Sequence, residues 1–247
     1  MSRESYDRIA AVYDTDMGRS MPFDDIGFYR RLCAARGGSV LELGCGTGRI
    51  LLPLLASGID IDGIDQSEGM LAELRAEAAR RGLQPTTAVG SLQSFVAARR
   101  YRTVLCPYAV LTYLTTPAEL ADCLQRVAQA LEPEGLLVVD TFIPRDVTAF
   151  DDFRLDYRRP HGAATLQREK RIAREGDCNR IERRYSLLAA DGSVERSWVT
   201  CDVIRPWQSA ELVAAAAGQG LQLRSSTTDF GAVSASPQFI VLQFGLR

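Results

Sequence analysis

The sequence VLELGCGTGRI, residues 40–50, places three glycines at alternate positions between a short apolar run and a stretch with helical patterning. Gly44, Gly46 and Gly48 leave the backbone bare where a strand turns into a helix. Such a turn lets a ligand approach the main chain closely, and the helix start supplies free N–H groups. A purely structural turn seldom needs three glycines in five residues. The stretch therefore predicts a loop that binds a small molecule.

Two classes of ligand use this geometry, dinucleotides and S-adenosylmethionine. The dinucleotide fingerprint is G-x-G-x-x-G, whereas these glycines follow G-x-G-x-G and the position of the third fingerprint glycine holds Arg49. Glu42, just before the loop, would add negative charge beside a pyrophosphate. Beside the ammonium and sulfonium groups of S-adenosylmethionine, the same carboxylate is favourable. The loop therefore favours S-adenosylmethionine.

A second acidic residue also indicates S-adenosylmethionine as the ligand. Asp65 ends the apolar run in DIDGIDQSEGML, residues 60–71, a position from which a carboxylate can accept hydrogen bonds from both ribose hydroxyls. The alternative is that Asp65 caps the next helix, although Ser67 could supply that cap. Met70 is a candidate for packing on the adenine and equally a candidate core residue.

Composition limits the class of protein. The chain has 247 residues, 46% of them hydrophobic, and a net charge of -2, so it can bury one substantial core and lacks the basic excess of a nucleic-acid or membrane-binding surface. No apolar run approaches the roughly 18 residues of a membrane span, and the N-terminus lacks a signal-peptide pattern, which predicts a cytoplasmic protein. The six scattered cysteines and the single histidine predict reduced, mostly buried thiols and no metal site.

The pattern along the chain predicts a single α/β domain, a Rossmann-like doubly wound sheet with a small antiparallel β insertion after the fifth strand. Apolar runs alternate with helical stretches at 48–56, 68–81 and 117–131. The expected organisation is an N-terminal helical cap at 1–36, a cofactor-binding core at 37–149, an antiparallel insertion forming a substrate lid at 150–206, and a final helix and strands at 207–247.

Residues 40–71 resemble the first two motifs of class I S-adenosylmethionine-dependent methyltransferases. Residues 106–144, CPYAVLTYLTTPAELADCLQRVAQALEPEGLLVVDTFIP, are similar to the fourth strand, the following helix and the fifth strand of that family. The resemblance implies a seven-stranded sheet whose last strand is antiparallel, with the active site over the carboxyl ends of the strands.

The resemblance also implies roles for individual residues. The positions that match the loop holding the methionine part of the cofactor are Glu42, Gly44, Cys45, Gly46 and Gly48. Asp65 and Gln66 match the ribose and adenine positions. Many relatives carry an aspartate after the third strand; here Ser91 stands in its place, so the contact to adenine falls to the Ser91 hydroxyl, the Leu92 backbone N–H or Gln93.

Four further positions carry implied roles around the methionine part and the transferring methyl group. Cys106 falls where the family uses a backbone carbonyl near the methionine part, and Pro107 and Tyr108 then lie nearest the methyl. Tyr13, in a leading helix like that of small-molecule methyltransferases, is a candidate to close over the cofactor and equally a core aromatic.

Methyl transfer from a sulfonium is an in-line displacement that needs no metal. The resemblance favours a small-molecule acceptor, most simply an amine of an amino sugar or amino acid, positioned by Tyr108 and Tyr113. His161 is a candidate general base for O- or C-methylation, and an exposed loop histidine is the competing interpretation. The arginines of the insertion are typical of a solvated face, although a few could bind an acidic substrate or a phosphate.

The sequence leaves two other classes of protein open. A dehydrogenase would need the missing glycine spacing, and a cofactor-binding module without catalytic activity has the same loop. A homodimer is compatible with the sequence, which says nothing more of oligomeric state.

Overall fold

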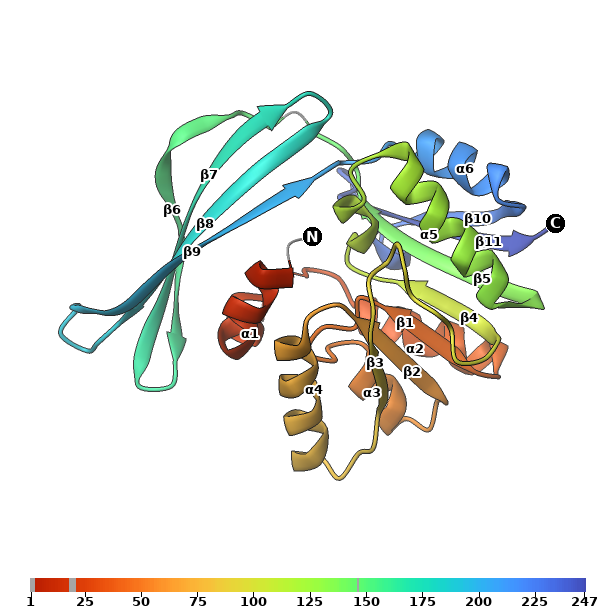
Figure 1. The fold of residues 1–247 in the computed structure, drawn as a ribbon, viewed down its shortest axis with the longest axis horizontal. Helices are drawn as coiled ribbons and strands as arrows, with labels where there is room; N and C mark the ends of the chain where they lie inside the picture. Colours follow the sequence, from red (N-terminus) through yellow and green to blue (C-terminus); the bar gives the residue numbers. More distant parts are fainter. Residues whose placement is uncertain (1–2, 18–20, 146) are drawn as a thin grey trace.

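The computed structural model describes residues 3–17, 21–145 and 147–247, which form two separate sheets and the helices around them (Figure 1). In chain order, the elements up to the fifth strand are α1 (Arg3–Met17), α2 (Asp25–Arg36), β1 (Val40–Leu43), α3 (Leu51–Ala56), β2 (Ile61–Asp65), α4 (Glu68–Arg80), β3 (Thr86–Val89), β4 (Tyr101–Cys106), the 3₁₀ turn η1 (Val110–Tyr113), α5 (Pro117–Ala130) and β5 (Leu131–Phe142). Then come β6 (Phe150–His161), β7 (Ala164–Glu175), β8 (Cys178–Leu188), β9 (Val194–Ile204), α6 (Ser209–Gly218), β10 (Leu221–Thr228), η2 (Asp229–Gly231) and β11 (Phe239–Leu246).

The larger sheet has seven strands in the order β10-β11-β5-β4-β1-β2-β3. Strands β1 to β5 pair in parallel, and β11 is antiparallel to both of its neighbours. This confirms the predicted doubly wound sheet with an antiparallel last strand. The strand order reverses between β1 and β4, and in open α/β sheets a ligand binds at this switch point, beyond the carboxyl ends of the strands.

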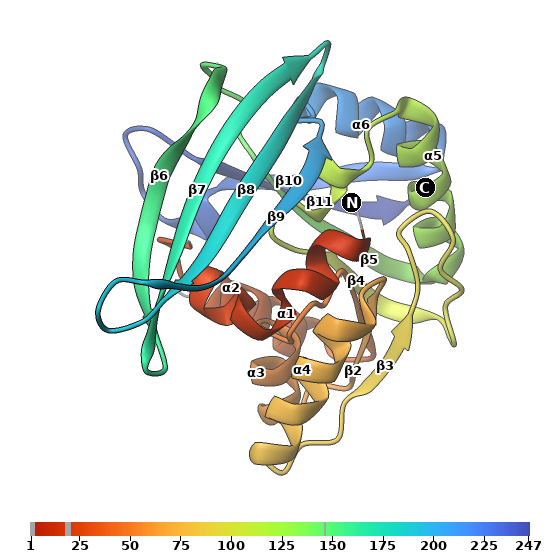
Figure 2. The same cartoon turned by 60° about the vertical axis from the view of Figure 1, so that its left-hand side comes forward.

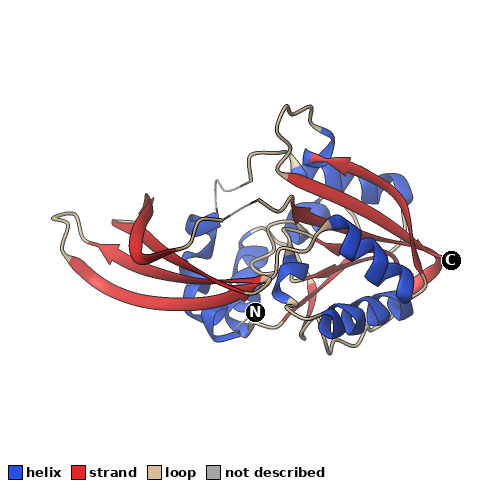
Figure 3. Cartoon of the chain, turned by 90° about the horizontal axis from the view of Figure 1, so that it is seen from above, coloured by secondary structure: helices blue, strands red, loops and turns tan. Residues whose placement is uncertain are grey.

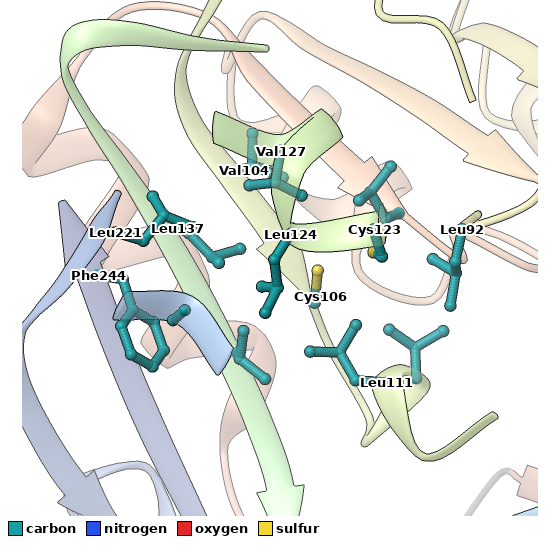
Figure 4. Packing of buried hydrophobic residues seen from close by; sticks show 14 of the residues in the cluster. Leu92, Val104, Cys106, Leu111, Cys123, Leu124, Val127, Leu137, Leu221 and Phe244 are labelled. Carbon is teal, nitrogen blue, oxygen red and sulfur yellow. The ribbon is translucent and has the colours of Figure 1, made fainter. Parts of the chain in front are cut away.

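Helices cover both faces of this sheet, which is why β1 is buried at all four positions. On one face α5 and α6 pack on β4, β5 and β11, with Leu124, Val127 and Leu137 in the centre of the cluster (Figure 4). On the other face α2, α3 and α4 bury a second apolar cluster that includes Leu51 and Leu71.

Strands β6 to β9 form a four-stranded antiparallel meander that stands beside the core as a separate layer (Figures 2 and 3). We call this meander the lid sheet. Glycines with positive φ occupy its three hairpin turns, at Gly162, Gly176 and Gly192. The predicted antiparallel insertion is therefore confirmed, including the hairpin signal at Asp191–Gly192.

Helix α1 lies between the two sheets and is bonded to both (Figures 1 and 2). On the core side, the Ser67 hydroxyl and the Gly69 N–H donate to Asp7, at 2.6 and 3.0 Å, and the Thr47 hydroxyl donates to Asp14 at 2.6 Å.

On the lid side, the buried carboxylate of Asp16 accepts hydrogen bonds from the hydroxyls of Tyr157 and Tyr185 and from the guanidinium of Arg168. Hydrogen bonds of α1 thus link the glycine loop and the start of α4 to the lid sheet.

Two boundaries differ from the expected ones. The helix expected at 48–56 begins at Leu51, because Gly48 has a φ of +87° and still belongs to the turn. Strand β5 begins at Leu131, where a helix end was expected; Leu131 pairs with Tyr101, and the register shifts before Leu136 pairs with Thr103.

The described cysteine side chains are free thiols, and four of the six are buried, as predicted. None of the described helices is both long and apolar enough to cross a lipid bilayer.

Replacing Asp16 with Asn is expected to lower the free energy of unfolding by about 3 kcal/mol, because the change removes the buried charge that pairs with Arg168 and weakens the acceptor of two hydroxyls. The matched control is Glu4→Gln on the same helix, where the pair with Arg8 is exposed and the change should stay within about 0.5 kcal/mol. Urea unfolding measures both. A loss for Asp16→Asn no larger than that of the control would show that α1 is held by its core contacts alone.

Candidate active site

The glycine loop after β1 is held by main-chain hydrogen bonds to the neighbouring strand. The N–H groups of Gly44 and Cys45 both donate to the carbonyl of Ile64, at 2.7 and 3.1 Å. The three loop glycines all have positive φ, and a Cβ at Gly44 would lie 2.6 Å from a methyl carbon of Val110. At Gly46 the nearest atom to such a Cβ would be Met70 Cε at 3.6 Å, so this glycine is bare toward open space.

That open space is a cavity of about 290 Å³ between the core and the lid sheet, which we call the central cavity. Its floor is formed by Gly44, Gly46 and Asp65, and its far wall by residues of β7, β8 and β9. Helix α1 contributes Tyr6 and Tyr13, and the segment after β4 contributes further residues. A ligand here contacts the bare loop, the N-terminal helix and the lid at once.

A second, small cavity of about 20 Å³ opens beside it, lined by Gln66, Ser91 and Leu92 among others. Gly44, Asp65 and Tyr113 line both cavities. The two hollows therefore meet beyond the carboxyl ends of β1 and β2, next to the switch point between β1 and β4 where a ligand is expected.

Asp65 joins three segments at this meeting point. One carboxylate oxygen accepts the N–H of Gly46 at 2.9 Å, and the other accepts the N–H of Ser67 at 2.8 Å. Burial raises the pKa of Asp65, and these backbone hydrogen bonds act against that rise. Ser67 itself caps α4, since its hydroxyl accepts the Met70 N–H. Asp65 thus orders the loop and still faces both cavities.

Glu42 lies beneath the loop and lines neither cavity. It is 2% exposed, and its Oε2 atom has no hydrogen-bond partner among the described residues. Burial raises the pKa of Glu42 well above its ordinary value, with Arg49 acting in the opposite direction. Arg49 is itself held by both carboxylate oxygens of Asp25, at 3.0 and 2.6 Å. The structure thus places Glu42 outside both cavities, and its contact with the cationic groups of the cofactor stays a prediction.

The remaining predicted cofactor residues divide by location. Tyr13 and Met70 line the central cavity, and Gln66, Ser91 and Leu92 line the small one. Cys45 and Cys106 are buried in the two apolar clusters, so only their main chain is available to a ligand. Gly48 lines a separate hollow on the far side of the loop, and Leu52 and Leu74 leave no room for a Cβ there.

The turn after β4 depends on a residue that the sequence analysis missed, Asp140 on β5. Tyr108 and Ala109 are both left-handed, with φ of +55° and +53°. Their N–H groups each donate to a carboxylate oxygen of Asp140 at 2.8 Å, and the Tyr29 hydroxyl donates to it at 2.5 Å. Asp140 is fully buried, and its burial raises its pKa to about 6. This carboxylate holds the strained turn that presents Tyr108 to the cavity.

Five of the described tyrosines line the central cavity, four of them on the core side and Tyr185 on the lid sheet. Tyr108 and Tyr113, the predicted positioning residues, both line it, as does Tyr13. Tyr6, which was not predicted, shares a short hydrogen bond with Tyr113 and lies 6.0 Å from Tyr13 between ring centroids. The signal for Tyr6 was in the sequence, since a spacing of seven residues puts Tyr6 and Tyr13 on one helix face.

The lid wall of the cavity is charged rather than apolar. Arg183 donates to Asp202 at 2.8 Å, and both residues line the cavity; Lys170, which also lines it, donates to Asp156 at 3.0 Å. Arg168 pairs with Asp16 and Asp156. A solvated sheet face was the interpretation favoured from the sequence, but alternate residues of β7 and β8 point inward and line the site.

His161 is not among the residues that line the central cavity. It ends β6 at the hairpin turn, and its Nδ1 atom lies 2.8 Å from the Thr15 hydroxyl. The structure thus places this histidine against the C-terminal half of α1 and does not bring it together with Tyr108 and Tyr113.

Comparison with known proteins agrees with the fold and the loop. A methyltransferase domain family matches residues 40–135. The chain is 28% identical to a dTDP-3-amino-3,6-dideoxy-alpha-D-glucopyranose N,N-dimethyltransferase from Streptomyces fradiae, over 75% of this chain and 73% of that protein. It is also 28% identical to a dTDP-3-amino-3,4,6-trideoxy-alpha-D-glucopyranose N,N-dimethyltransferase from Streptomyces venezuelae, over 87% and 90% of the two chains. Among solved structures, the CcbJ methyltransferase from Streptomyces caelestis superposes with a TM-score of 0.80 at 26% identity, over 100% of this chain and 99% of that one.

The doubly wound sheet, the bare glycine loop and the acid at the end of β2 define an enzyme that binds S-adenosylmethionine. The chain is an S-adenosylmethionine-dependent methyltransferase with its methyltransferase domain match at residues 40–135, and it is similar to the amino-sugar N-methyltransferases.

Replacing Asp65 with Ala is expected to weaken binding of S-adenosylhomocysteine at least tenfold, since the change removes acceptors for charge-assisted hydrogen bonds worth roughly 1.5 to 3 kcal/mol each. Calorimetry measures the affinity. Asp62→Ala is the control, because Asp62 lies on the same strand and pairs with Arg99 and Tyr101 away from both cavities. Equal affinities for the two variants would mean that the ribose is held elsewhere.

Asp140 is expected to make stability depend on pH. Its pKa of about 6 in the folded protein lies above the ordinary value of 3.8, so its contribution to stability is full below about pH 4 and is lost as the pH rises through about 6. The advantage of the wild type over Asp140→Asn in unfolding free energy should be about 1 kcal/mol larger at pH 5 than at pH 8. Tyr29→Phe keeps the carboxylate and should keep this pH dependence. An advantage that is the same at both pH values would show that Asp140 titrates normally.

Proposed function

We propose that the enzyme methylates the amine nitrogen of a small molecule, most simply an amino sugar, by direct displacement without a general base. Both curated relatives described above are named as N,N-dimethyltransferases of amino sugars. The observation that carries the proposal is the set of buried phenols around the cavity, because their protonation state fixes what they can do.

Burial raises the pKa of Tyr108 to about 12 and also raises that of Tyr113. At neutral pH both side chains therefore stay protonated, and a neutral phenol is a poor base for removing a proton from an alcohol. A phenol can still donate and accept hydrogen bonds, which is what orienting a neutral amine requires. These two tyrosines are positioning residues in this proposal.

The cofactor half of the site is assigned by the same proposal. The bare main chain at Gly44 and Gly46 adjoins the methionine part, and Asp65 accepts the ribose hydroxyls. The adenine adjoins Ser91 and Leu92, whose cavity of about 20 Å³ must widen to admit it. When bound, S-adenosylmethionine supplies an electrophilic methyl group on a sulfonium. Tyr13 on α1 and the lid sheet shield this region from water, and shielding strengthens the electrostatic contacts inside.

The amine acceptor enters from the lid side in this proposal. Asp16 and Asp202 at the cavity wall pair with Arg168 and Arg183, so they offset the positive charge that the lid presents to an amine. The aromatic faces of Tyr6 and Tyr13 also favour a cation. The amine reacts as its neutral form, and its remaining proton passes to solvent after transfer.

The proposal is tested by incubating the protein with labelled S-adenosylmethionine and matched pairs of small acceptors, each an amino sugar and its hydroxyl counterpart. Label should appear in the amines. Label in the hydroxyl compounds alone would favour O-methylation and overturn the proposal.

His161→Ala is expected to lower kcat/KM for the amine acceptor by no more than a few-fold, since His161 lies at the hairpin turn and bonds Thr15. The pH profile should then follow the pKa of the acceptor amine. The comparison is Tyr113→Phe, which removes a hydroxyl from the cavity and should lower kcat/KM by roughly tenfold or more. A loss of about 100-fold in His161→Ala, with the limb near pH 6 to 7 abolished, would make this histidine the base.

A further inference from the structure

The charged lid wall of the central cavity has one apolar stretch, at the end where the lid sheet is attached to the core. Ile172 and Ile181 are paired across β7 and β8, and Ile204 lies on β9 two residues beyond the partner of Ile181. Ile204 is the last residue of β9, and Ile172 also pairs with Phe150, the first residue of β6. All three isoleucines line the cavity. We call them the isoleucine patch.

The isoleucine patch is separate from the apolar clusters of the described part of the chain. Its side chains belong neither to the clusters on the two faces of the seven-stranded sheet nor to the cluster between α1 and the lid sheet. The cross-strand pair Lys170 and Arg183 adjoins the patch on the side of α1. Each isoleucine is only partly buried. The patch therefore presents apolar surface to the cavity that a bound ligand can cover.

The core side of the same cavity carries an aromatic ring with similar properties. Phe142, the last residue of β5, lines the cavity and is 39% exposed. Its ring centroid lies 6.1 Å from that of Tyr108, in an edge-to-face arrangement. One exposed apolar side chain is ordinary in a protein. Four of them around one cavity, with a few polar groups beside them, are typical of a site that binds the hydrocarbon part of a small molecule.

This apolar end belongs to the acceptor half of the cavity. The cofactor half is the floor, formed by Gly44, Gly46 and Asp65, whereas the isoleucine patch is on the lid wall. Phe142 adjoins Tyr108, which orients the acceptor amine in the proposed function. A group that lies against Phe142 and the isoleucine patch is therefore close to that amine.

We infer that the methyl acceptor carries a hydrocarbon group near its amine, and that the isoleucine patch and Phe142 bind this group. The inference rests on the proposed function, because it concerns the same acceptor.

The isoleucine patch and Phe142 are specificity-determining residues in this inference. Covering them with hydrocarbon removes apolar surface from water, which favours binding. A hydroxyl or a charged group in the same place would lose its hydrogen bonds to water, and isoleucine and phenylalanine side chains cannot replace them. The acceptor class that follows is an amphipathic amine.

The test is calorimetry with butylamine, hexylamine and 6-aminohexan-1-ol, each titrated into protein saturated with S-adenosylhomocysteine. Hexylamine is expected to bind about tenfold more tightly than butylamine, because each additional buried methylene group tightens binding by a factor of about three or four. The hydroxyl of 6-aminohexan-1-ol would be buried against apolar side chains, so this amine should bind about tenfold more weakly than hexylamine.

Ile172→Thr and Ile181→Thr are each expected to reduce the advantage of hexylamine over butylamine by about threefold. The matched control is Val199→Thr, which makes the same kind of change on the other face of the lid sheet. Val199 is 41% exposed and pairs with Arg184, whose neighbour in the strand, Arg183, faces the cavity. This control should keep the full advantage. Affinity for S-adenosylhomocysteine should be unchanged in all three variants, which shows that each is folded.

Equal binding of butylamine and hexylamine, or of hexylamine and 6-aminohexan-1-ol, would overturn the inference. An advantage of hexylamine that neither isoleucine variant reduces, or that Val199→Thr reduces equally, would overturn it too. These results leave amine methylation intact, since the labelled acceptors test it separately. Conversely, label only in hydroxyl acceptors, together with a hexylamine advantage that depends on Ile181, would reject the amine and retain the hydrocarbon site.

Discussion

The carboxylate of Asp65 is the interaction on which the arrangement of the site depends. It holds the N–H of Gly46 in the glycine loop and the N–H of Ser67 at the start of α4, so the ends of β1 and β2 keep one geometry. Helix α1 is then bonded to these same two segments, through Asp14 to the loop and Asp7 to the start of α4. The lid sheet is bonded in turn to α1. Hydrogen bonds to a series of acidic side chains therefore fix the position of the lid sheet relative to the glycine loop.

Burying a charged group costs free energy, and several of the buried charged groups of this protein lie around the central cavity. Asp140 forms no ion pair with the described residues, and its carboxylate accepts hydrogen bonds from two main-chain N–H groups and the Tyr29 hydroxyl. On the lid, each inward cation of the central cavity has a carboxylate neighbour, as Arg183 has Asp202. The result is a cavity that is polar and close to electrically balanced, in which a small change of charge on a ligand has a large effect.

The fold could be predicted from the sequence because its signals are local. The glycine loop, the alternation of apolar runs with helical stretches, and the hairpin at Asp191–Gly192 each occupy a few consecutive residues. Much of the cofactor half could be placed for the same reason. Glu42 and Cys45 were placed in the right loop, but whether a side chain there faces the ligand or the core is decided by the packing of α3 and β2.

The acceptor half could not be predicted in this way, since its residues meet only in three dimensions. Asp140 sits in the apolar run GLLVVDTF, and a carboxylate in a buried strand was a visible signal, but its partners are 31 and 111 residues away. The inward face of β7 could not be told from its outward face, because both carry charged side chains. His161 attracted attention as the single histidine, and rarity in a sequence gives no information about position.

Within the described part of the chain, β6 to β9 pair with one another and share no backbone ladder with the core sheet. Removing residues 150–204 would break none of the ladder hydrogen bonds within the seven-stranded sheet. The lid sheet is therefore a module attached to the core at two points, and its contacts must match those of α1. Lids from related enzymes could be exchanged at these two points to change substrate choice, provided that the donor lid supplies counterparts of Tyr157, Arg168 and Tyr185 for Asp16.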